Sequence, residues 1–270
     1  MAFSSFRLVF VLVLLLLAAC AQGDVEEALD ANVTPTAAPV DQAQAIVDQA
    51  IAAHGGDRLR QAVVEFDFRD KHFKIIRNGG TYSYERTYTD STGAVLEVLN
   101  NDGIYREVNG VPVTLTEDEK TRLATPLNSV PYFALLPFNL NDPAVQKRYL
   151  GEAEIEGRPY HKIEVTFQQE GGGRDFEDRF IYWFDKDRHT MDYMAYDFHI
   201  NDGGTRFRQA FNTRTVGGVR FADYHNFVSD SLPGPETAIE RYDDFMQTGA
   251  VRLLSEIILD NVTVQPLDAE

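Results

Sequence analysis

Three consecutive strands predicted in the middle of the chain constrain its fold more than any other feature. In the second of them, residues 160–168, apolar side chains such as Ile163 and Val165 alternate with polar ones. This two-residue period is typical of a half-buried strand. A Gly-Arg-Pro turn joins it to the strand at 149–156, and a glycine-rich connector joins it to the strand at 179–185. Such short connections predict an antiparallel meander.

The last strand of this meander has apolar side chains on both faces. Phe180 and Tyr182 point to one face, and Ile181 and Trp183 point to the other. A strand of this kind is buried on both sides, so other elements must cover both faces of the sheet there. A sheet with two covered faces can hold a ligand.

Turn signals recur about every ten residues along much of the chain after residue 60, which is the spacing of an up-and-down sheet or barrel. The segments between the predicted strands are too short for the helical crossovers that a parallel sheet requires. We therefore predict a mainly β fold with some α-helix, in which about ten or more antiparallel strands form a curved sheet. Residues 41–270 are expected to form a single domain.

Two helical segments are predicted to pack on the concave side of this sheet. Asp41 can cap the first, which ends near His54 and the two glycines that follow it. A histidine at a helix end is favourable with the helix dipole, so His54 is assigned a structural role. Thr116 begins the second helix, with acidic residues in its first turn.

The second helix runs into an apolar segment, residues 126–140, that contains three prolines. Such a segment cannot be a solvent-facing amphipathic helix, so it must be buried or lie over a pocket. Two interpretations are open. The segment fills the core as a plug, or it covers a ligand groove as a lid.

Aromatic rows on the predicted strands and this segment supply the candidate ligand-binding residues. If they share one inner face, their side chains should contact a hydrophobic ligand or one another. The candidates are Phe66, Phe68, Tyr82, Tyr84, Arg86, Tyr132, Phe133, Leu136, Phe180 and Tyr182. Arg86 lies in a row of tyrosines, which indicates a position near an opening: its stem packs on the rings at a rim, or its guanidinium contacts a head group or carboxylate.

The amino terminus is predicted to carry a lipoprotein signal. An apolar run at residues 8–19 is too short to span a bilayer as a helix and has the length of a signal-peptide core. It ends in Leu-Ala-Ala-Cys, which looks like a lipobox, so we predict a signal peptide at 1–19 and a lipid anchor on Cys20. The alternative is an ordinary signal peptide with an incidental cysteine. Residues 20–40 are acidic and without an amphipathic period, which is typical of a flexible tether.

The net charge and the spacing of motifs limit the partners and the kinds of site that the chain is expected to have. The formal net charge is −17 and no basic face is evident, so nucleic acid is not an expected partner. The histidines lack zinc-site spacing, the connector at 170–178 lacks the spacing of an EF-hand, and no Gly-x-Ser-x-Gly motif is present. We predict no catalytic residue, no metal and no cofactor. An envelope hydrolase or lyase with converging acids and histidines is the alternative, and a structural or partner-binding lipoprotein with a filled core is another.

The run G-x-A-x-I-x-G-R-x-Y-x-x-I-x-V from Gly151, followed by the YWFD strand, resembles the lipoprotein-sorting carriers of the LolA, LolB and LppX type. The chain is also similar to a group of uncharacterised bacterial envelope lipoproteins that carry the same HGG, ERTY, NSVPYFALLP and LNDPAV runs. The resemblance implies a half-open antiparallel barrel with helices on its concave face, and a lipid or acyl-bearing ligand. With Ala21 after the cysteine, it also implies attachment to the outer membrane through Cys20, on the periplasmic side or facing the surface.

Overall fold

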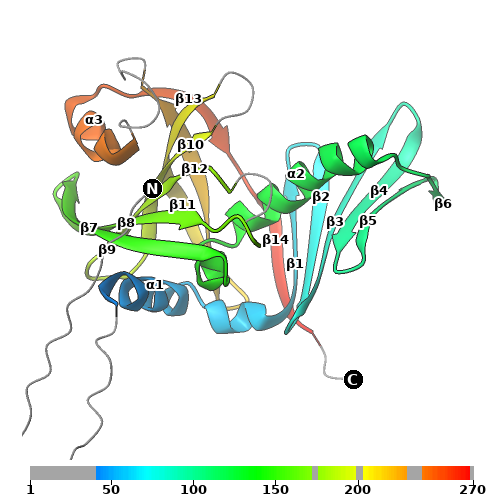
Figure 1. The fold of residues 1–270 in the computed structure, drawn as a ribbon, viewed down its shortest axis with the longest axis horizontal. Helices are drawn as coiled ribbons and strands as arrows, with labels where there is room; N and C mark the ends of the chain where they lie inside the picture. The colour runs from blue at the N-terminus through cyan, green and yellow to red at the C-terminus, as the bar shows by residue number, and fades with distance from the viewer. Residues whose placement is uncertain (1–40, 172–175, 199–202, 230–238, 268–270) are drawn as a thin grey trace, which may run out of the picture. The chain divides into compact units, whose positions relative to one another are not determined.

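Within the described residues, two antiparallel sheets of seven strands each form the body of the fold (Figure 1). The computed structural model describes residues 41–171, 176–198, 203–229 and 239–267. The predicted signal peptide, Cys20 and the tether lie outside these residues. The chain from Val40 to Glu270 forms one compact unit.

The first sheet, sheet A, comes mainly from the part of the chain before residue 113. Its strands are β1 Gln61–Phe68, β2 Lys71–Asn78, β3 Thr81–Asp90, β4 Gly93–Asn100, β5 Gly103–Val108, β6 Val111–Pro112 and β14 Asp260–Pro266. The order is β14-β1-β2-β3-β4-β5-β6, so successive hairpins build all of it except β14. The sheet therefore follows the predicted up-and-down pattern.

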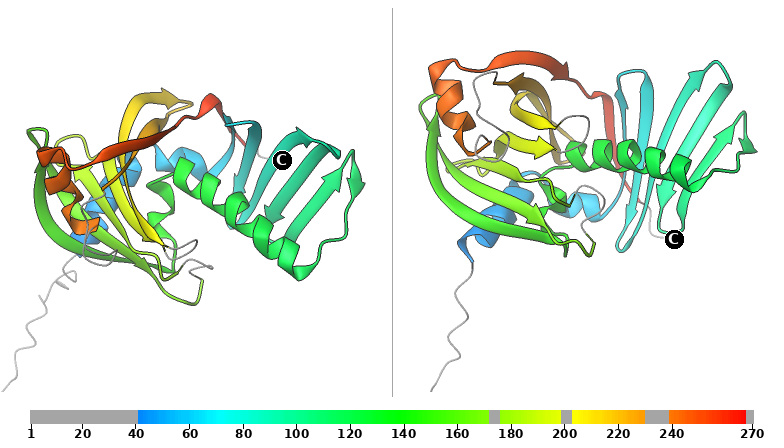
Figure 2. Two further views of the ribbon diagram at one scale, coloured as in Figure 1. Left: turned by 90° about the horizontal axis from the view of Figure 1, so that it is seen from above. Right: turned by 45° about the horizontal axis from the view of Figure 1, so that its top comes forward.

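The second sheet, sheet B, contains the predicted meander. Its strands are β7 Val145–Ile155, β8 Arg158–Phe167, β9 Phe180–Asp185, β10 Met191–Phe198, β11 Gly204–Val216, β12 Val219–Val228 and β13 Arg252–Ile257. The order runs from β13 to β7 in reverse sequence. Two residues join β13, at the edge of sheet B, to β14, at the edge of sheet A, so this segment passes from one sheet to the other (Figures 1 and 2).

The predicted fold class is confirmed, with one difference in detail. All strand pairs in the two sheets are antiparallel, and the sheets form an open half-barrel of the expected type. The strands belong to two sheets rather than one, however. Residues 113–144 separate β6 from β7, and this connection is too long for a hairpin, so the two strands do not pair.

Helices cover the sheets where the apolar strands required it. They are α1 Gln42–Ala53, α2 Glu117–Ala134 and α3 Tyr242–Thr248, with short 3-10 turns at Gly56–Arg60, Phe138–Asn141 and Ile239–Arg241. One face of β9 packs with α1 and the end of α2, and the other packs with α3. On that second face, the Tyr242 ring stacks on Phe207 with centroids 5.1 Å apart. The predicted burial of β9 on both sides is confirmed.

Both helix starts follow the predicted capping chemistry. The Asp41 carboxylate accepts the Ala43 N–H at 3.0 Å, and Thr116 forms a reciprocal capping box with Glu119. The prolines at 126 and 131 do not break α2, which runs through both and lies across the strands of sheet A before its last turns reach sheet B (Figure 2). Tertiary packing of the helix outweighs the cost of about 3 kcal/mol that a proline imposes in a helix interior.

His54 ends α1 as predicted, but not as a charged partner of the helix dipole. The residue is 5% exposed, and burial together with the positive charge of Arg220 lowers the pKa of its ring to about 3. Its Nε2 accepts the Met191 N–H at 3.1 Å, which requires an unprotonated nitrogen. The ring therefore ties α1 to β10 in its neutral form, because desolvation outweighs the favourable dipole.

Candidate functional site

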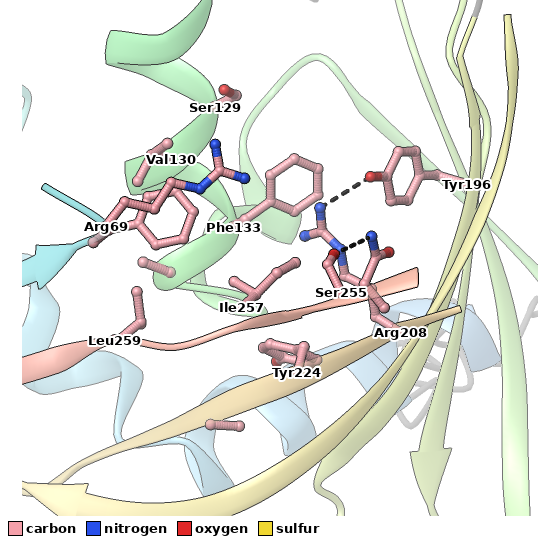
Figure 3. A pocket seen from close by; sticks show the side chains of 14 residues that line it. Arg69, Ser129, Val130, Phe133, Tyr196, Arg208, Tyr224, Ser255, Ile257 and Leu259 are labelled. Carbon is pink, nitrogen blue, oxygen red and sulfur yellow. Dashed lines mark hydrogen bonds between the residues drawn. The ribbon is translucent and has the colours of Figure 1, made fainter. Parts of the chain in front are cut away.

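A cavity of about 320 Å³ lies beneath the last turns of α2, where sheet A and sheet B meet (Figure 3). Its walls come from α2, from β10 to β12, from β13 and the link to β14, and from the end of β1 and the turn after it. The lining residues are Phe68, Arg69, Ser129, Val130, Phe133, Ala134, Tyr196, Arg208, Ala222, Tyr224, Asn226, Ser255, Ile257 and Leu259.

Strand register explains why polar groups reach one side of this cavity. A single cross-strand row runs over the inner face of sheet B from the packed core to the edge strand. Its members, in order, are Ile163, Tyr182, Met194, Arg208, Asn226 and Ser255. The row changes from apolar to polar where it passes from the core to the cavity, so one wall of the cavity carries hydrogen-bonding groups while the α2 wall is largely apolar.

Arg208 is the charged group at the centre of the polar wall. Its guanidinium lies 4.5 Å from the centroid of Phe133 and 5.1 Å from that of Tyr196. Its Nη2 donates to the Tyr196 hydroxyl at 2.9 Å, and Figure 3 shows this bond. Its buried Nε has no hydrogen-bond partner within the described residues. The cation is thus held by rings and one neutral hydroxyl.

Neutral polar groups complete this wall. Asn226 donates from Nδ2 to the Ser255 Oγ at 3.1 Å, while its buried Oδ1 has no partner in the described part of the chain. Burial raises the pKa of Tyr224 to about 12, so its hydroxyl stays protonated at neutral pH. These groups can donate and accept hydrogen bonds without adding charge.

Two of the predicted ligand-binding residues, Phe68 and Phe133, line the cavity. Phe133 lies 6.2 Å from Phe180 and 5.7 Å from Tyr196 between ring centroids, so it connects the packed core of sheet B to the cavity. Apart from Arg86, the remaining candidates lie in two packed clusters. Leu136, Phe180 and Tyr182, with Tyr132 against them, belong to the core under α1; Phe66 and Tyr84, with Tyr82 against them, belong to the core of sheet A.

Arg86 does not lie at an opening. It is 8% exposed, and its Nε donates to Glu97 Oε2 at 2.8 Å across the β3–β4 hairpin. The Tyr88 hydroxyl donates to the other oxygen of Glu97 at 3.0 Å. The rim interpretation of Arg86 is therefore wrong, because a carboxylate from the next strand already neutralises the guanidinium inside the fold.

Sequence reasoning did not select Arg208 as a candidate. The available signal was a cation between Phe207 and Ala210 in a predicted strand, on the side opposite the buried Phe207. A charged side chain on the inner face of a sheet is costly unless it is paired, so an arginine at such a position is a candidate binding residue.

The described residues contain no group of three or more His, Cys, Asp and Glu side chains that could hold a metal ion. In the same residues, no helix has the length and apolar character needed to cross a bilayer.

Residues 33–248 match the model of a family described as "Family of unknown function (DUF6503)". No curated protein matches the chain. The solved structures similar to it include a LolA superfamily protein from Nitrosomonas europaea, a DUF1329 family protein from Desulfovibrio piger and the lipoprotein LppX from Mycobacterium tuberculosis.

The first is 10% identical with a TM-score of 0.43, covering 84% of this chain and 94% of its own. The second is 12% identical with a TM-score of 0.37, covering 83% and 93%. The third is 15% identical with a TM-score of 0.27, covering 59% and 88%. The resemblance stated from the sequence is thus found among solved structures. At these identities it concerns the fold and says nothing about a ligand.

Proposed function

The chain belongs to DUF6503, a family of unknown function, and we propose that it binds a hydrophobic ligand, a lipid or another acyl-bearing molecule, in the cavity beneath α2. The single observation that supports this proposal most strongly is the cavity itself. Its volume of about 320 Å³ falls at the lower end of the range of roughly 300 to 1,000 Å³ for small-molecule sites. Its walls combine apolar side chains with a few polar groups, as such sites do.

The apolar wall favours a ligand with a hydrocarbon part. Val130 and Phe133 from α2 face Ile257 and Leu259 across the cavity in Figure 3. A hydrocarbon placed between them would remove apolar surface from water on both sides, which is worth about 25 cal/mol per Å². A small polar substrate would gain nothing from these walls.

The proposed setting is the cell envelope, with the protein attached to the outer membrane through a lipid on Cys20. The apolar run and the Leu-Ala-Ala-Cys sequence support this proposal. Metabolic labelling with a fatty-acid analogue tests it: the unchanged chain should incorporate label, and Cys20→Ser should not. Equal labelling of both would overturn the lipid anchor.

Ligand binding is tested on a chain without the first 19 residues and with Cys20→Ser, so that no covalent lipid interferes. Native mass spectrometry should show a co-purifying ligand, and a fluorescent fatty-acid probe should bind. Ala222→Phe places a ring in the cavity and should weaken probe binding at least about tenfold, since it competes for the same space. Thr213→Phe, on an exposed position of β11, is the matched control and should bind normally.

If the shortened Cys20→Ser chain, without any substitution in the cavity, showed neither a co-purifying ligand nor probe binding, the proposal would be contradicted and a protein with a filled core would be favoured. Equal binding by the unchanged chain and Ala222→Phe would place the ligand elsewhere.

A further inference from the structure

We propose that the ligand carries an oxyanion head group, a carboxylate or a phosphate, and that Arg208 binds it. This inference rests on the ligand-binding function proposed above and specifies its ligand class. It begins from the charge of the cavity wall. Arg69 and Arg208 line the cavity, and no acidic side chain does so within the described residues. The charged side chains that line the cavity are thus both positive, in a chain with a net charge of −17.

Several arginines of sheet B and of its β9–β10 turn differ from Arg208. Four of these arginines each pair with a carboxylate. The pairs are Arg148–Glu164 at 2.6 Å, Arg188–Asp185 at 2.6 Å, Arg214–Asp223 at 3.1 Å and Arg220–Asp192 at 3.1 Å. Arg208 forms no such pair within the described residues, although its guanidinium lies over two aromatic rings, whereas the Arg148 side chain is largely exposed. Arg206, also on β11, has no carboxylate pair among the described residues either, but it lies outside the cavity and donates to the Thr205 carbonyl at 2.7 Å. Arg208 is therefore the arginine of sheet B that lines the cavity and lacks a carboxylate partner in the described part of the chain.

The surroundings of Arg208 leave space for an anion that accepts hydrogen bonds from its guanidinium. Phe133 and Tyr196 offer the faces of their rings, which attract a cation but accept no strong hydrogen bond. The buried Nε has no hydrogen-bond partner in the described part of the chain, and a buried donor without a partner is destabilising. A carboxylate or phosphate can accept from a guanidinium through two parallel hydrogen bonds, which satisfies this need.

The arrangement also orients the ligand. Figure 3 shows Arg208 on the side of the cavity next to Tyr196 and Ser255, and it shows Val130 and Leu259 on the other side. Asn226 belongs to the first side, because it pairs with Arg208 across the strands and donates to Ser255. The head group would lie at the first side and the hydrocarbon would extend toward the second. Arg69 reaches toward Phe133 from the apolar side, so it does not share the position of Arg208.

The experiment compares three ligands with the same twelve-carbon tail: dodecanoic acid, dodecyl phosphate and dodecanol. Binding to the chain that starts at position 20 with Cys20→Ser is measured by calorimetry at pH 8, where the acid and the phosphate are ionised. We expect at least one of the two anions to bind about tenfold more tightly than the alcohol, as a charge-assisted hydrogen bond implies. The tighter of the two identifies the head group.

Arg208→Gln keeps a donor but removes the charge, and it should bring the ratio of anion to alcohol affinity close to one. Arg206→Gln is the matched control, because Arg206 lies two residues away on the same face of β11 but outside the cavity, over the ring of Phe198. It should preserve the ratio. A circular dichroism spectrum and melting curve of each variant show that it is folded.

The outcomes separate this inference from the proposed function. If all three ligands bind equally to the unchanged chain, the head-group inference is overturned and hydrophobic binding stands. If none binds, the proposed function itself fails. If Arg206→Gln lowers the ratio as much as Arg208→Gln, the preference reflects general charge, and the assignment to Arg208 is overturned.

Discussion

Arg86 in sheet A and Arg208 in sheet B both lie among tyrosine side chains beneath α2, and the two sheets treat these two charges differently. In sheet A, Glu97 on the neighbouring strand accepts from the guanidinium of Arg86. In sheet B, Arg208 donates to the neutral hydroxyl of Tyr196 and lies over aromatic rings. The positions are similar, but only the first cation is neutralised by the protein.

The difference separates a structural charge from an available one. Glu97 is fully buried, and a carboxylate in that setting needs the cations and hydrogen-bond donors around it, so its pair with Arg86 belongs to the architecture of the sheet. Arg208 borders a cavity, where a bound molecule can supply the missing acceptor. Chemical type alone, an arginine among tyrosines, does not distinguish the two roles. The two roles are distinguished by whether the neighbouring strand supplies a carboxylate to the arginine.

The largest effect is expected from breaking the pair in sheet A. Glu97→Gln keeps the size of the side chain but leaves the buried Arg86 without a counter-charge, and Arg106 Nε also lies 3.9 Å from Glu97. Loss of one partner from a buried ion pair costs about 3 to 5 kcal/mol. Urea unfolding should show this loss in the free energy of unfolding.

Two controls sharpen this test. The surface pair between Glu117 and Lys120 is largely exposed on its acidic side, so Glu117→Gln should cost less than about 1 kcal/mol. The double variant Arg86→Met/Glu97→Leu removes both charges and should recover much of the stability. A single Glu97→Gln variant as stable as the unchanged protein would show that the pair does not hold sheet A together.

The last turn of α2 and the residues just after it allow the next comparison, between a filled core and the cavity. Leu136 is 5% exposed within the core under α1, whereas Phe133 lines the cavity. Leu136→Ala should cost about 2 to 5 kcal/mol, as in other buried leucine positions. Phe133→Ala should cost less despite its larger side chain, because one side of the ring already borders open space, and it should weaken probe binding. Thermal melting and probe titration of both variants test this. A greater loss of stability in Phe133→Ala would favour the plug interpretation for the whole segment.

His54 extends the comparison of buried charges to a side chain whose charge depends on pH. Its folded pKa of about 3 lies below the ordinary value of 6.5, so the unfolded chain binds the proton more readily as the pH falls below 6.5. The contribution of the neutral His54 ring to the free energy of unfolding is therefore fully present above pH 6.5 and decreases as the pH falls toward 3. Between pH 7 and pH 5 the loss should be on the order of 2 kcal/mol.

The measurement is the free energy of unfolding at both pH values for the unchanged protein and for His54→Gln, whose amide oxygen can still accept the Met191 N–H. The variant should lose clearly less between pH 7 and pH 5. Equal losses would mean that other groups cause the acid sensitivity and that His54 is not desolvated as the structure indicates.

Local chemistry allowed much of the fold to be predicted. Alternation around Ile163, the two-sided apolar pattern of β9 and the caps at Asp41 and Thr116 each depend on neighbours within a few residues. The division into two sheets depends on the path of α2, which short-range patterns do not specify. The same limit explains why α2 passes through its prolines, since packing against distant strands determines that outcome.

The site was less predictable because register, not residue type, decides which charges meet. Arg86 and Glu97 lie at equal distances from the tip of the β3–β4 hairpin, so their pairing could have been inferred from the turn. Arg208 and Asn226 pair across β11 and β12, but a bulge between Phe211 and Arg214 shifts the register there. Counting from the turn would not have located this pair reliably, and the cavity depends on it.

The smallest effect is expected from removing the unpaired charge in sheet B. Arg208→Gln removes a stacked cation and its hydrogen bond to Tyr196, and it also relieves the cost of holding a charge away from water without a carboxylate. These contributions oppose each other, so the free energy of unfolding in urea should change by less than about 1 kcal/mol, with an unchanged m-value. The comparison with Glu97→Gln is then direct, because both variants change one charge beneath α2. A loss in Arg208→Gln as large as in Glu97→Gln would make Arg208 a structural cation and would remove the distinction between the two sheets. A small loss, together with a reduced preference for anionic ligands, would show that sheet B maintains this charge for binding.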